Sequence, residues 1–249
     1  MKNTTAISQV YKDLLESLKQ ERKPFPSGSL IIRNKRHYQR ISRKDKGITQ
    51  DRDKVRQLSR KRYIDILIKG ITEYLNTPLK DIHQFKFPTH EQIIQTFPPS
   101  FQELPDSYFQ ISTLDAWLSQ PFKTNPNNKE ALIYPTKQDY KVRSKEEIFI
   151  TNALTDHNIP HRYEAAYRLG TKTVYPDYTL INRYTGKQFI WEHHGAFHIE
   201  KYGKNAHKKI VAYTNNGLLL NDTLIITYDD DIKIKGRLQE IIKNIIMKI

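Results

Sequence analysis

The sequence predicts an α/β fold whose last 107 residues follow the order α-β-β-β-α-β, with one further helix at the end. Helical and strand patterns alternate there, beginning at the capping-box pattern Ser144-x-x-Glu147. The beginning of the chain differs, because helical spacing of apolar residues surrounds one strongly basic stretch. We therefore expect three segments: a mostly helical, basic region containing a β-hairpin (1–77), a proline-rich connecting or wrapping segment (78–142) and an α/β core (143–249).

The basic region is expected to contain two helices with a hairpin between them. Apolar residues recur at helical spacing over 4–22 and again over 51–76. Between them, Pro24–Gly28 breaks the chain, and residues 29–42 have the β-branched and aromatic content of two strands around a polar turn at Asn34-Lys35-Arg36. The next segment is irregular, because eight of the 12 prolines lie between Pro78 and Pro135; it contains only short helical signals at 91–97 and 112–120.

The α/β core is expected to begin with a helix over 144–157. A short strand at 162–167 follows, and two strands at 173–183 and 187–194 are joined by a turn at Tyr184-Thr185-Gly186. The remaining elements are predicted as a helix at 205–215, ending before Gly217, a buried strand at 224–228 and a helix at 232–249. Asp229-Asp230-Asp231 is most simply a solvated loop after the last strand.

Composition restricts the class of protein. The 249 residues carry 41 Lys and Arg against 27 Asp and Glu, a formal charge of +14, and a polyanion is therefore the first partner to consider. The absence of cysteine excludes disulfides, thiolate nucleophiles and cysteine-based zinc sites. No apolar run approaches the length of a membrane span, and the first residues lack the apolar core of a secretory signal. We expect a cytoplasmic protein without membrane contact.

The positive charge is concentrated in one stretch. Residues 33–62 contain 13 Lys and Arg and three Asp, which is a net +10, and the other 219 residues share +4. We expect this stretch to contact the phosphates of a nucleic acid, DNA first. The candidate contact residues are Arg33, Lys35, Arg36, Arg40, Arg43 and Lys44. A solvated basic face, or a docking surface for an acidic protein, is the alternative.

Strand pairing brings two acids together. If Tyr184 and Thr185 form the turn, the numbers of opposed residues sum to 369, and Asp177 lies opposite Glu192. Like charges directly opposite on one sheet face repel each other. A sequence that places them there is expected to supply a cation between them, and hard oxygen ligands favour Mg²⁺ or Mn²⁺.

These residues also carry a family resemblance. Pro176-Asp177 followed by Glu192-His193-His194, set in the α-β-β-β-α-β order, resembles the PD-(D/E)XK nuclease superfamily over about 143–228. Further motifs look like a largely uncharacterised group of bacterial and phage-type nuclease-like proteins, whose N-terminal halves carry a similar Gly-Ser-Leu basic strand and helix. These motifs are ArgSerLys-x-Glu (143–147), IleProHisArgTyrGlu (159–164), TrpGluHisHisGly (191–195) and Lys209-x-x-x-Tyr213.

The resemblance implies a restriction-endonuclease-like core and metal-dependent hydrolysis of phosphodiester bonds. Asp177, Glu192 and the main-chain carbonyl of His193 would hold one or two Mg²⁺ ions, with Mn²⁺ as the substitute. Glu147 would be a further ligand or would orient a metal-bound water, although its capping-box position is a sufficient reason for a glutamate there.

One motif position departs from the family. The lysine usually found two residues after the second acid is His194 here, which can orient a water or take a proton but carries no permanent charge. We expect Lys209, or its neighbour Lys208, to supply that charge. The alternative is a catalytically silent nucleic-acid-binding protein that has kept the fold.

Plainer interpretations of the same residues stay open. Asp177 is then a strand-entry residue, and Glu192 is an exposed strand acid. Four histidines, His193, His194, His198 and His207, suggest a zinc site, but only His194 shares the carboxylate face, which argues against one. A homodimer would suit duplex cleavage by a single active site. The sequence leaves open DNA or RNA, duplex or single strand, and any sequence specificity.

Overall fold

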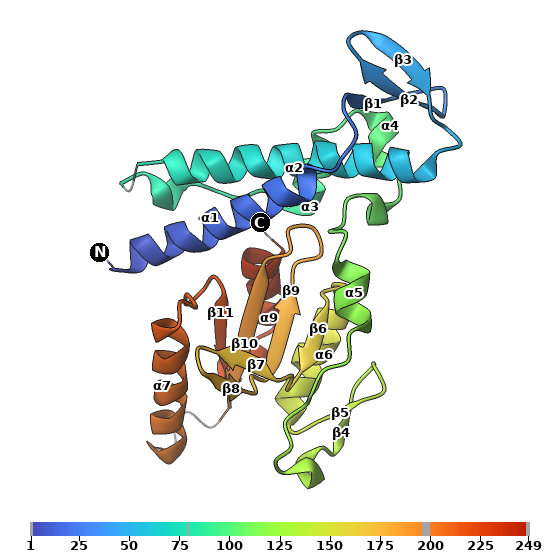
Figure 1. Cartoon of the computed structure of the whole chain (residues 1–249). Helices are drawn as coiled ribbons and strands as arrows, with labels where there is room; N and C mark the ends of the chain where they lie inside the picture. Colours follow the sequence, from blue (N-terminus) through green and yellow to red (C-terminus); the bar gives the residue numbers. More distant parts are fainter. Residues whose placement is uncertain (1, 79, 196–199, 248–249) are drawn as a thin grey trace. The chain divides into compact units, whose positions relative to one another are not determined.

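The computed structural model describes residues 2–78, 80–195 and 200–247 (Figure 1). The chain is mixed α/β, as predicted, and it divides into two compact units. The first unit comprises the chain up to Asp115 together with the loop Tyr184–Gly186; the second comprises Ala116–Arg183 and Lys187–Met247. The segment 78–142, which we expected to form one connection, is therefore divided between the two units. No helix in the described ranges is long and apolar enough to span a membrane.

Two long helices form the base of the first unit. α1 (Lys2–Arg22) lies along α2 (Arg52–Asn76), close to the predicted bounds (Figure 1). The Asp51 side chain caps α2 by accepting a hydrogen bond from the main-chain N–H of Lys54 at 3.0 Å. The apolar sides of both helices meet in the core, where Leu18, Leu67 and Ile71 are almost completely buried.

The basic stretch between these helices is a three-stranded antiparallel sheet. Its strands are β1 (Ser29–Arg33), β2 (Arg36–Ile41) and β3 (Lys44–Gly47), in that order. The predicted hairpin is correct for the first two strands, but the prediction missed β3. The reason is that all four residues of β3 are exposed, so no apolar alternation marks the strand.

A glycine holds the entry to this sheet. Gly28 has φ +81°, and a Cβ built there would lie 2.2 Å from the main-chain oxygen of Arg40. Only glycine fits this position, since the adjacent pair Ser29 and Arg40 starts the β1–β2 ladder.

The first part of the proline-rich segment wraps α2 with short helical turns. Three large side chains from it, Phe97, Phe101 and Phe109, are buried in the core, and the Phe109 ring lies 5.8 Å from that of Tyr63 on α2. These turns are η1 (Ile82–Gln84), α3 (His90–Gln95), α4 (Pro99–Gln102) and η2 (Asp106–Tyr108). Of the two helical turns that follow, α5 (Leu114–Ser119) crosses the boundary between the units and η3 (Lys129–Ala131) belongs to the second unit.

A four-stranded sheet forms the centre of the second unit, with the strand order β11-β10-β9-β6. β10 is parallel to β11 and antiparallel to β9, which is antiparallel to β6. The predicted order is present as α6-β6-β9-β10-α7-β11. The bounds are α6 (Lys145–Asp156), β6 (His161–Tyr163), β9 (Tyr178–Ile181), β10 (Gln188–His194), α7 (Glu200–Asn215) and β11 (Leu224–Tyr228).

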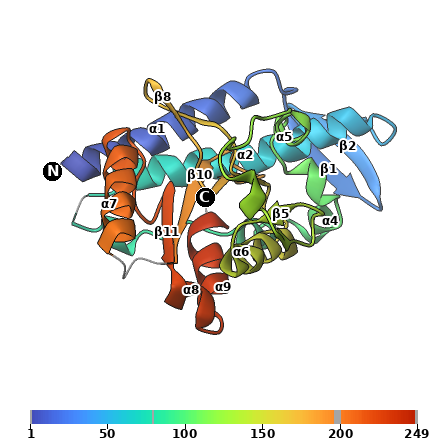
Figure 2. The same cartoon turned by 90° about the horizontal axis from the view of Figure 1, so that it is seen from below.

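Helices cover both faces of this sheet, as Figure 2 shows from below. α6 and the C-terminal helices pack on one face, over the fully buried Tyr178 and Trp191. α7 lies on the other face, where Tyr213 packs with Ile190 and Leu224.

The strand predicted over 173–183 is divided in the structure. Its first part is β8 (Lys172–Val174), which pairs with β7 (Tyr167–Leu169) as a separate ribbon, and its second part is β9. Pro176 lies at the break, since proline has no N–H to donate to a ladder. The predicted strand 162–167 likewise divides between β6 and β7. A further ribbon pairs β4 (Tyr134–Pro135) with β5 (Lys141–Val142).

The predicted C-terminal helix 232–249 is also interrupted. α8 (Asp229–Lys233) begins three residues earlier, so the prediction of a loop at 229–231 was wrong: Asp231 accepts a hydrogen bond from the main-chain N–H of Tyr228 at the helix start. Gly236, with φ +87°, separates α8 from α9 (Arg237–Ile241) and a π-helical turn η4 (Ile242–Ile246).

Candidate active site and nucleic-acid interface

The ladder between β9 and β10 has the predicted register. Its pairs run from Ile181 opposite Gln188 to Tyr178 opposite Trp191, and each pair of numbers sums to 369. The connection between the strands is 182–187 and not the two residues assumed, but it is centred on Tyr184 and Thr185, so the register is the same. The next position places Asp177 opposite Glu192, at the point where β9 begins.

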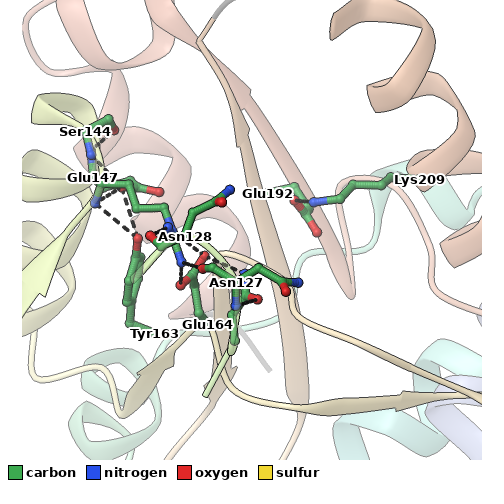
Figure 3. Close-up of polar contacts among 10 residues, drawn as sticks. Asn127, Asn128, Ser144, Glu147, Tyr163, Glu164, Glu192 and Lys209 are labelled. Atoms are coloured by element: carbon green, nitrogen blue, oxygen red, sulfur yellow. Dashed lines mark hydrogen bonds and ion pairs between the residues drawn. The ribbon is translucent and has the colours of Figure 1, made fainter. Parts of the chain in front are cut away.

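Two side chains from α7 hold the carboxylate of Glu192. The Nζ of Lys209 lies 2.8 Å from Oε2 (Figure 3). The hydroxyl of Tyr213 donates to Oε1 at 2.6 Å. Glu192 is only 1% exposed, whereas the Lys209 side chain is half-exposed. Burial lowers the pKa of Lys209, but the carboxylates of Glu192 and Asp177 outweigh it and raise that pKa above its ordinary value. Lys209 therefore places a positive charge beside the acid, and its role in place of the family's lysine stays a prediction.

Asp177 lies half-buried beside this pair. Its Oδ2 accepts a hydrogen bond from the main-chain N–H of His193 at 2.7 Å. Burial, and next the Glu192 carboxylate, raise the pKa of Asp177 well above its ordinary value, although Lys209 and the hydrogen bond act against them. Among the described residues, Asp177 forms no ion pair, so its negative charge is only partly compensated.

A third carboxylate, which sequence reasoning missed, continues the row. β6 pairs with β9 so that Tyr163 lies opposite Tyr178, and the next position sets Glu164 opposite Asp177. The main-chain N–H of Glu164 donates to the carbonyl of Asp177 at 3.0 Å, which confirms that alignment. Glu164 is buried and accepts two hydrogen bonds of 2.8 Å from the Arg143 guanidinium (Figure 3). We call Glu164, Asp177 and Glu192 the carboxylate row.

Glu147 is held at the start of α6. Its Oε2 accepts hydrogen bonds from the main-chain N–H groups of Arg143 and Ser144, at 2.7 and 2.8 Å, and from the hydroxyl of Tyr163 at 3.2 Å (Figure 3). The capping box predicted from the sequence is present. Burial raises the pKa of Glu147, and the hydrogen bonds at the helix start oppose that effect. Its charge in turn contributes to the raised pKa of Asp177.

The two histidines at the end of β10 lie on opposite faces. His193 points away from the row, with Nδ1 3.1 Å from the hydroxyl of Thr227. His194 is on the face of Glu192, and its Nε2 is buried without a hydrogen-bond partner in the described chain. Burial lowers the pKa of His194. The main-chain carbonyl of His193 remains a predicted ligand; the contact found is made by the N–H of that residue.

The donor set suits a hard divalent cation. Asp177 and Glu192 offer carboxylate oxygens, and those that already accept a hydrogen bond, Oδ2 of Asp177 and both oxygens of Glu192, keep a further lone pair. The incompletely compensated Asp177 would gain most from a cation. In the described ranges, no three His, Asp or Glu side chains already form a metal-binding group. A cation would therefore rely on Asp177 and Glu192, completed by main-chain oxygen or water.

The basic sheet of the first unit divides its six candidate residues into two sets. Asp45 binds two of them, with Arg40 at 2.7 Å and Arg33 at 2.8 Å. For the other four, the described structure contains no ion pair. They are Lys35, Arg36, Arg43 and Lys44. Lys35 and Arg43 stand at the tips of the two tight turns, each with a positive φ, of 59° and 68°.

Two cations of the basic stretch are held within the first unit. Arg60 is 3% exposed and binds Glu21 at 2.8 Å, and Arg62 lies over the rings of Phe97 and Phe101. Both side chains therefore have a structural role in the packing of this unit.

Comparison of the chain with protein-family models, with curated proteins and with solved structures finds no match.

Proposed function

We propose that this protein is a metal-dependent nuclease, with a restriction-endonuclease-like core, that hydrolyses phosphodiester bonds in nucleic acid, DNA first. The observation that carries the proposal is the half-buried Asp177 next to the buried Glu192 and Lys209, in a chain of charge +14. Acids at a site that attracts phosphate repel the phosphate unless a cation bridges the acids to it. The order α6-β6-β9-β10-α7-β11 supports the assignment of the core.

Asp177 and Glu192 would hold Mg²⁺ or Mn²⁺, with the main-chain carbonyl of His193, while Glu147 would act on a water near them. When bound, the metal would polarise the phosphate, lower the pKa of a bound water and compensate the charge on the leaving oxygen.

Three side chains would act beside the metal ligands. Tyr213 keeps Glu192 in one orientation through its 2.6 Å hydrogen bond. Lys209 presents a permanent positive charge to the negative charge that grows on the phosphate. His194 would orient a water through its Nε2, which has no hydrogen-bond partner among the described residues.

The first unit would deliver the substrate. Lys35, Arg36, Arg43 and Lys44 offer four cations on one small sheet, and contacts with phosphates add affinity without sequence information. Arg33 and Arg40 share Asp45, so they contribute less charge to such a contact.

One observation favours a second function, that of a catalytically silent nucleic-acid-binding protein. Both oxygens of Glu192 already accept a hydrogen bond from α7, and His194 stands where the family has lysine. In that case Lys209 and Tyr213 stabilise a site that no longer takes a metal.

The deciding experiment is cleavage of end-labelled duplex DNA, single-stranded DNA and RNA with Mg²⁺, Mn²⁺ or EDTA. We expect metal-dependent cleavage that falls by about 10³-fold in Asp177→Asn and Glu192→Gln, and by about 10²-fold in Lys209→Ala. The matched controls are Asp156→Asn and Lys137→Ala, an exposed ion pair elsewhere in the second unit. If the wild type cuts none of the substrates better than Asp177→Asn with either metal, catalysis is refuted; tight, salt-sensitive binding would then identify the silent binder.

A further inference from the structure

A cavity of about 440 Å³ lies in the second unit, next to the edge strand β6. Its size is within the range of small-molecule and cofactor sites, about 300–1,000 Å³. All its lining residues belong to the second unit, and they include Tyr163 and Glu164 at the end of β6. Neither the carboxylate row nor the basic sheet explains its presence.

Planar rings form much of the wall. The rings of Tyr140 and Tyr163 are stacked with centroids 5.8 Å apart and 25° between their planes. Phe122 is 43% exposed, and the guanidinium of Arg162 lies 4.8 Å from its ring and 4.1 Å from that of Trp117. Such a wall provides flat, apolar surface with a cation at its edge, which suits a flat aromatic ligand.

The charge around the cavity is positive. Lys129, Lys141 and Arg162 line it, while its single acid, Glu164, is neutralised by Arg143. The ligand is therefore expected to combine an aromatic ring with negative charge.

The cavity adjoins the carboxylate row. Glu164 is a wall residue of the cavity and a member of the row at once, and its main-chain N–H binds the carbonyl of Asp177. A phosphodiester held at Asp177 would therefore have a neighbouring nucleotide within reach of the Glu164 side of the cavity. Figure 3 shows Glu164 with Asn127 and Asn128 on the side of the row away from Lys209.

We propose that this cavity binds an unpaired nucleobase of single-stranded nucleic acid, next to the phosphodiester presented to the carboxylate row. The inference rests on the proposed function for its substrate class. A nucleobase has the flat π-face that the rings match, and its phosphates supply the negative charge that the cations attract. Bases inside a duplex are stacked on both faces, so the cavity selects single strands, or bases turned out of the helix.

The test measures binding without cleavage, by fluorescence anisotropy of short labelled oligonucleotides in EDTA. The probes are single-stranded DNA, single-stranded RNA, duplex DNA, and an abasic strand with the same number of phosphates. We expect Phe122→Ala and Tyr140→Ala to weaken binding of at least one of the single strands by about tenfold each. Binding of the duplex and of the abasic strand should stay within twofold, and the stronger of the DNA and RNA responses identifies the sugar. Phe149→Ala, which removes a 60% exposed phenylalanine of α6 outside the cavity, is the control.

A second readout maps the contact directly. Ultraviolet cross-linking of a 4-thiothymidine strand, followed by peptide mass spectrometry, should label residues of the cavity wall, and Phe122→Ala should lower the yield. Wild-type-like binding by both variants, or an equal loss with the abasic strand, would overturn the proposal. These outcomes do not depend on nuclease activity. If the wild type never cleaves but Phe122→Ala still weakens single-strand binding, the base-binding site is supported and only the proposed nuclease function fails.

Discussion

At the scale of single residues, the molecule contains a charge that its fold does not balance. Arg143 neutralises Glu164 and Lys209 neutralises Glu192, but Asp177, between them, is half-buried and has a raised pKa. A buried carboxylate with too little compensation destabilises a fold, and such groups are frequent at functional sites. The row is therefore a place where stability and function conflict.

Replacing this carboxylate should stabilise the protein while it removes function. Because burial and Glu192 raise the pKa of Asp177, its ionised form costs folding free energy at neutral pH. We expect Asp177→Asn to increase the free energy of unfolding by on the order of 1 kcal/mol in EDTA, as measured by urea denaturation. Mg²⁺ or Mn²⁺ should stabilise the wild type, by about 2.7 kcal/mol at a hundredfold excess over the dissociation constant, and leave the variant unchanged. Equal metal effects on both would show that Asp177 is not a ligand.

His161 should make stability depend on pH. Its Nδ1 lies 2.8 Å from the carbonyl of Ile159 and its Nε2 3.2 Å from the hydroxyl of Tyr140, so a neutral ring donates to the first and accepts from the second. Burial lowers the pKa of His161 below its ordinary 6.5. The unfolded chain therefore binds the proton first, and the contribution of His161, complete above about pH 6.5, is lost as the pH falls.

The measurement is the free energy of unfolding of the wild type and of His161→Gln between about pH 8 and pH 5. The advantage of the wild type should shrink below about pH 6.5, by at most about 1.4 kcal/mol per pH unit. A constant difference over this range would contradict the assignment of a neutral, buried ring.

At the scale of elements, the basic sheet has charged residues at turn positions where they reduce its stability. Both of its tight turns, Asn34-Lys35 and Ser42-Arg43, have positive φ at both central residues, a conformation that usually selects glycine in the second position. Relative to glycine, a lysine or an arginine in this conformation lowers the free energy of unfolding by about 1 kcal/mol. The sequence nevertheless places cations at both tips, where they extend farthest from the sheet.

Glycine at these tips should separate the two effects. We expect Lys35→Gly and Arg43→Gly to raise the free energy of unfolding of the first unit by about 0.5–1 kcal/mol each, and to weaken binding of nucleic acid. Lys46→Gln, which removes an exposed charge from β3 outside the turns and outside the six candidate contact residues, is the matched control for the loss of charge. Unchanged affinity in both glycine variants would remove the turn tips from the interface.

At the scale of the whole molecule, the basic residues that give the net charge of +14 are not equally available to a partner. Of the 13 cations between residues 33 and 62, Arg60 is buried against Glu21, Arg62 packs on two phenylalanine rings, and Arg33 and Arg40 share Asp45. Four of the six candidate contact residues remain without an ion pair in the described ranges. The number of phosphates contacted should therefore be well below the number of basic residues.

The salt dependence of binding tests this count. Each phosphate contact contributes about 0.9 to the slope of log K against log salt for duplex DNA and about 0.7 for single strands. Converting Lys35, Arg36, Arg43 and Lys44 together to Gln should lower the slope by at most about 3.6 for a duplex. The control removes four exposed lysines elsewhere: Lys12, Lys19, Lys69 and Lys172. An equal fall in both sets would mean that the protein attracts nucleic acid by its overall charge alone.

Much of the architecture was predictable because it is encoded by local spacing. Capping signals and the period of apolar residues predicted α2 and α6, and the length of the 182–187 connection set the register that brings Asp177 opposite Glu192. Where local signals failed, the cause was also local: β3 has no apolar face, and Pro176 divides a run that otherwise has the composition of one strand.

What the sequence by itself determined is therefore each helix and hairpin with a strong local signal, and with them the two opposed acids. Only the tertiary structure decided that Glu164 joins the row, that Arg143 pairs with it and that a cavity opens beside it. The reason is that β6 and β9 are separated by the β7–β8 ribbon, so their register depends on how both strands pack in the sheet. Pairings between distant segments follow from the fit of a whole core, which no short pattern of residues specifies.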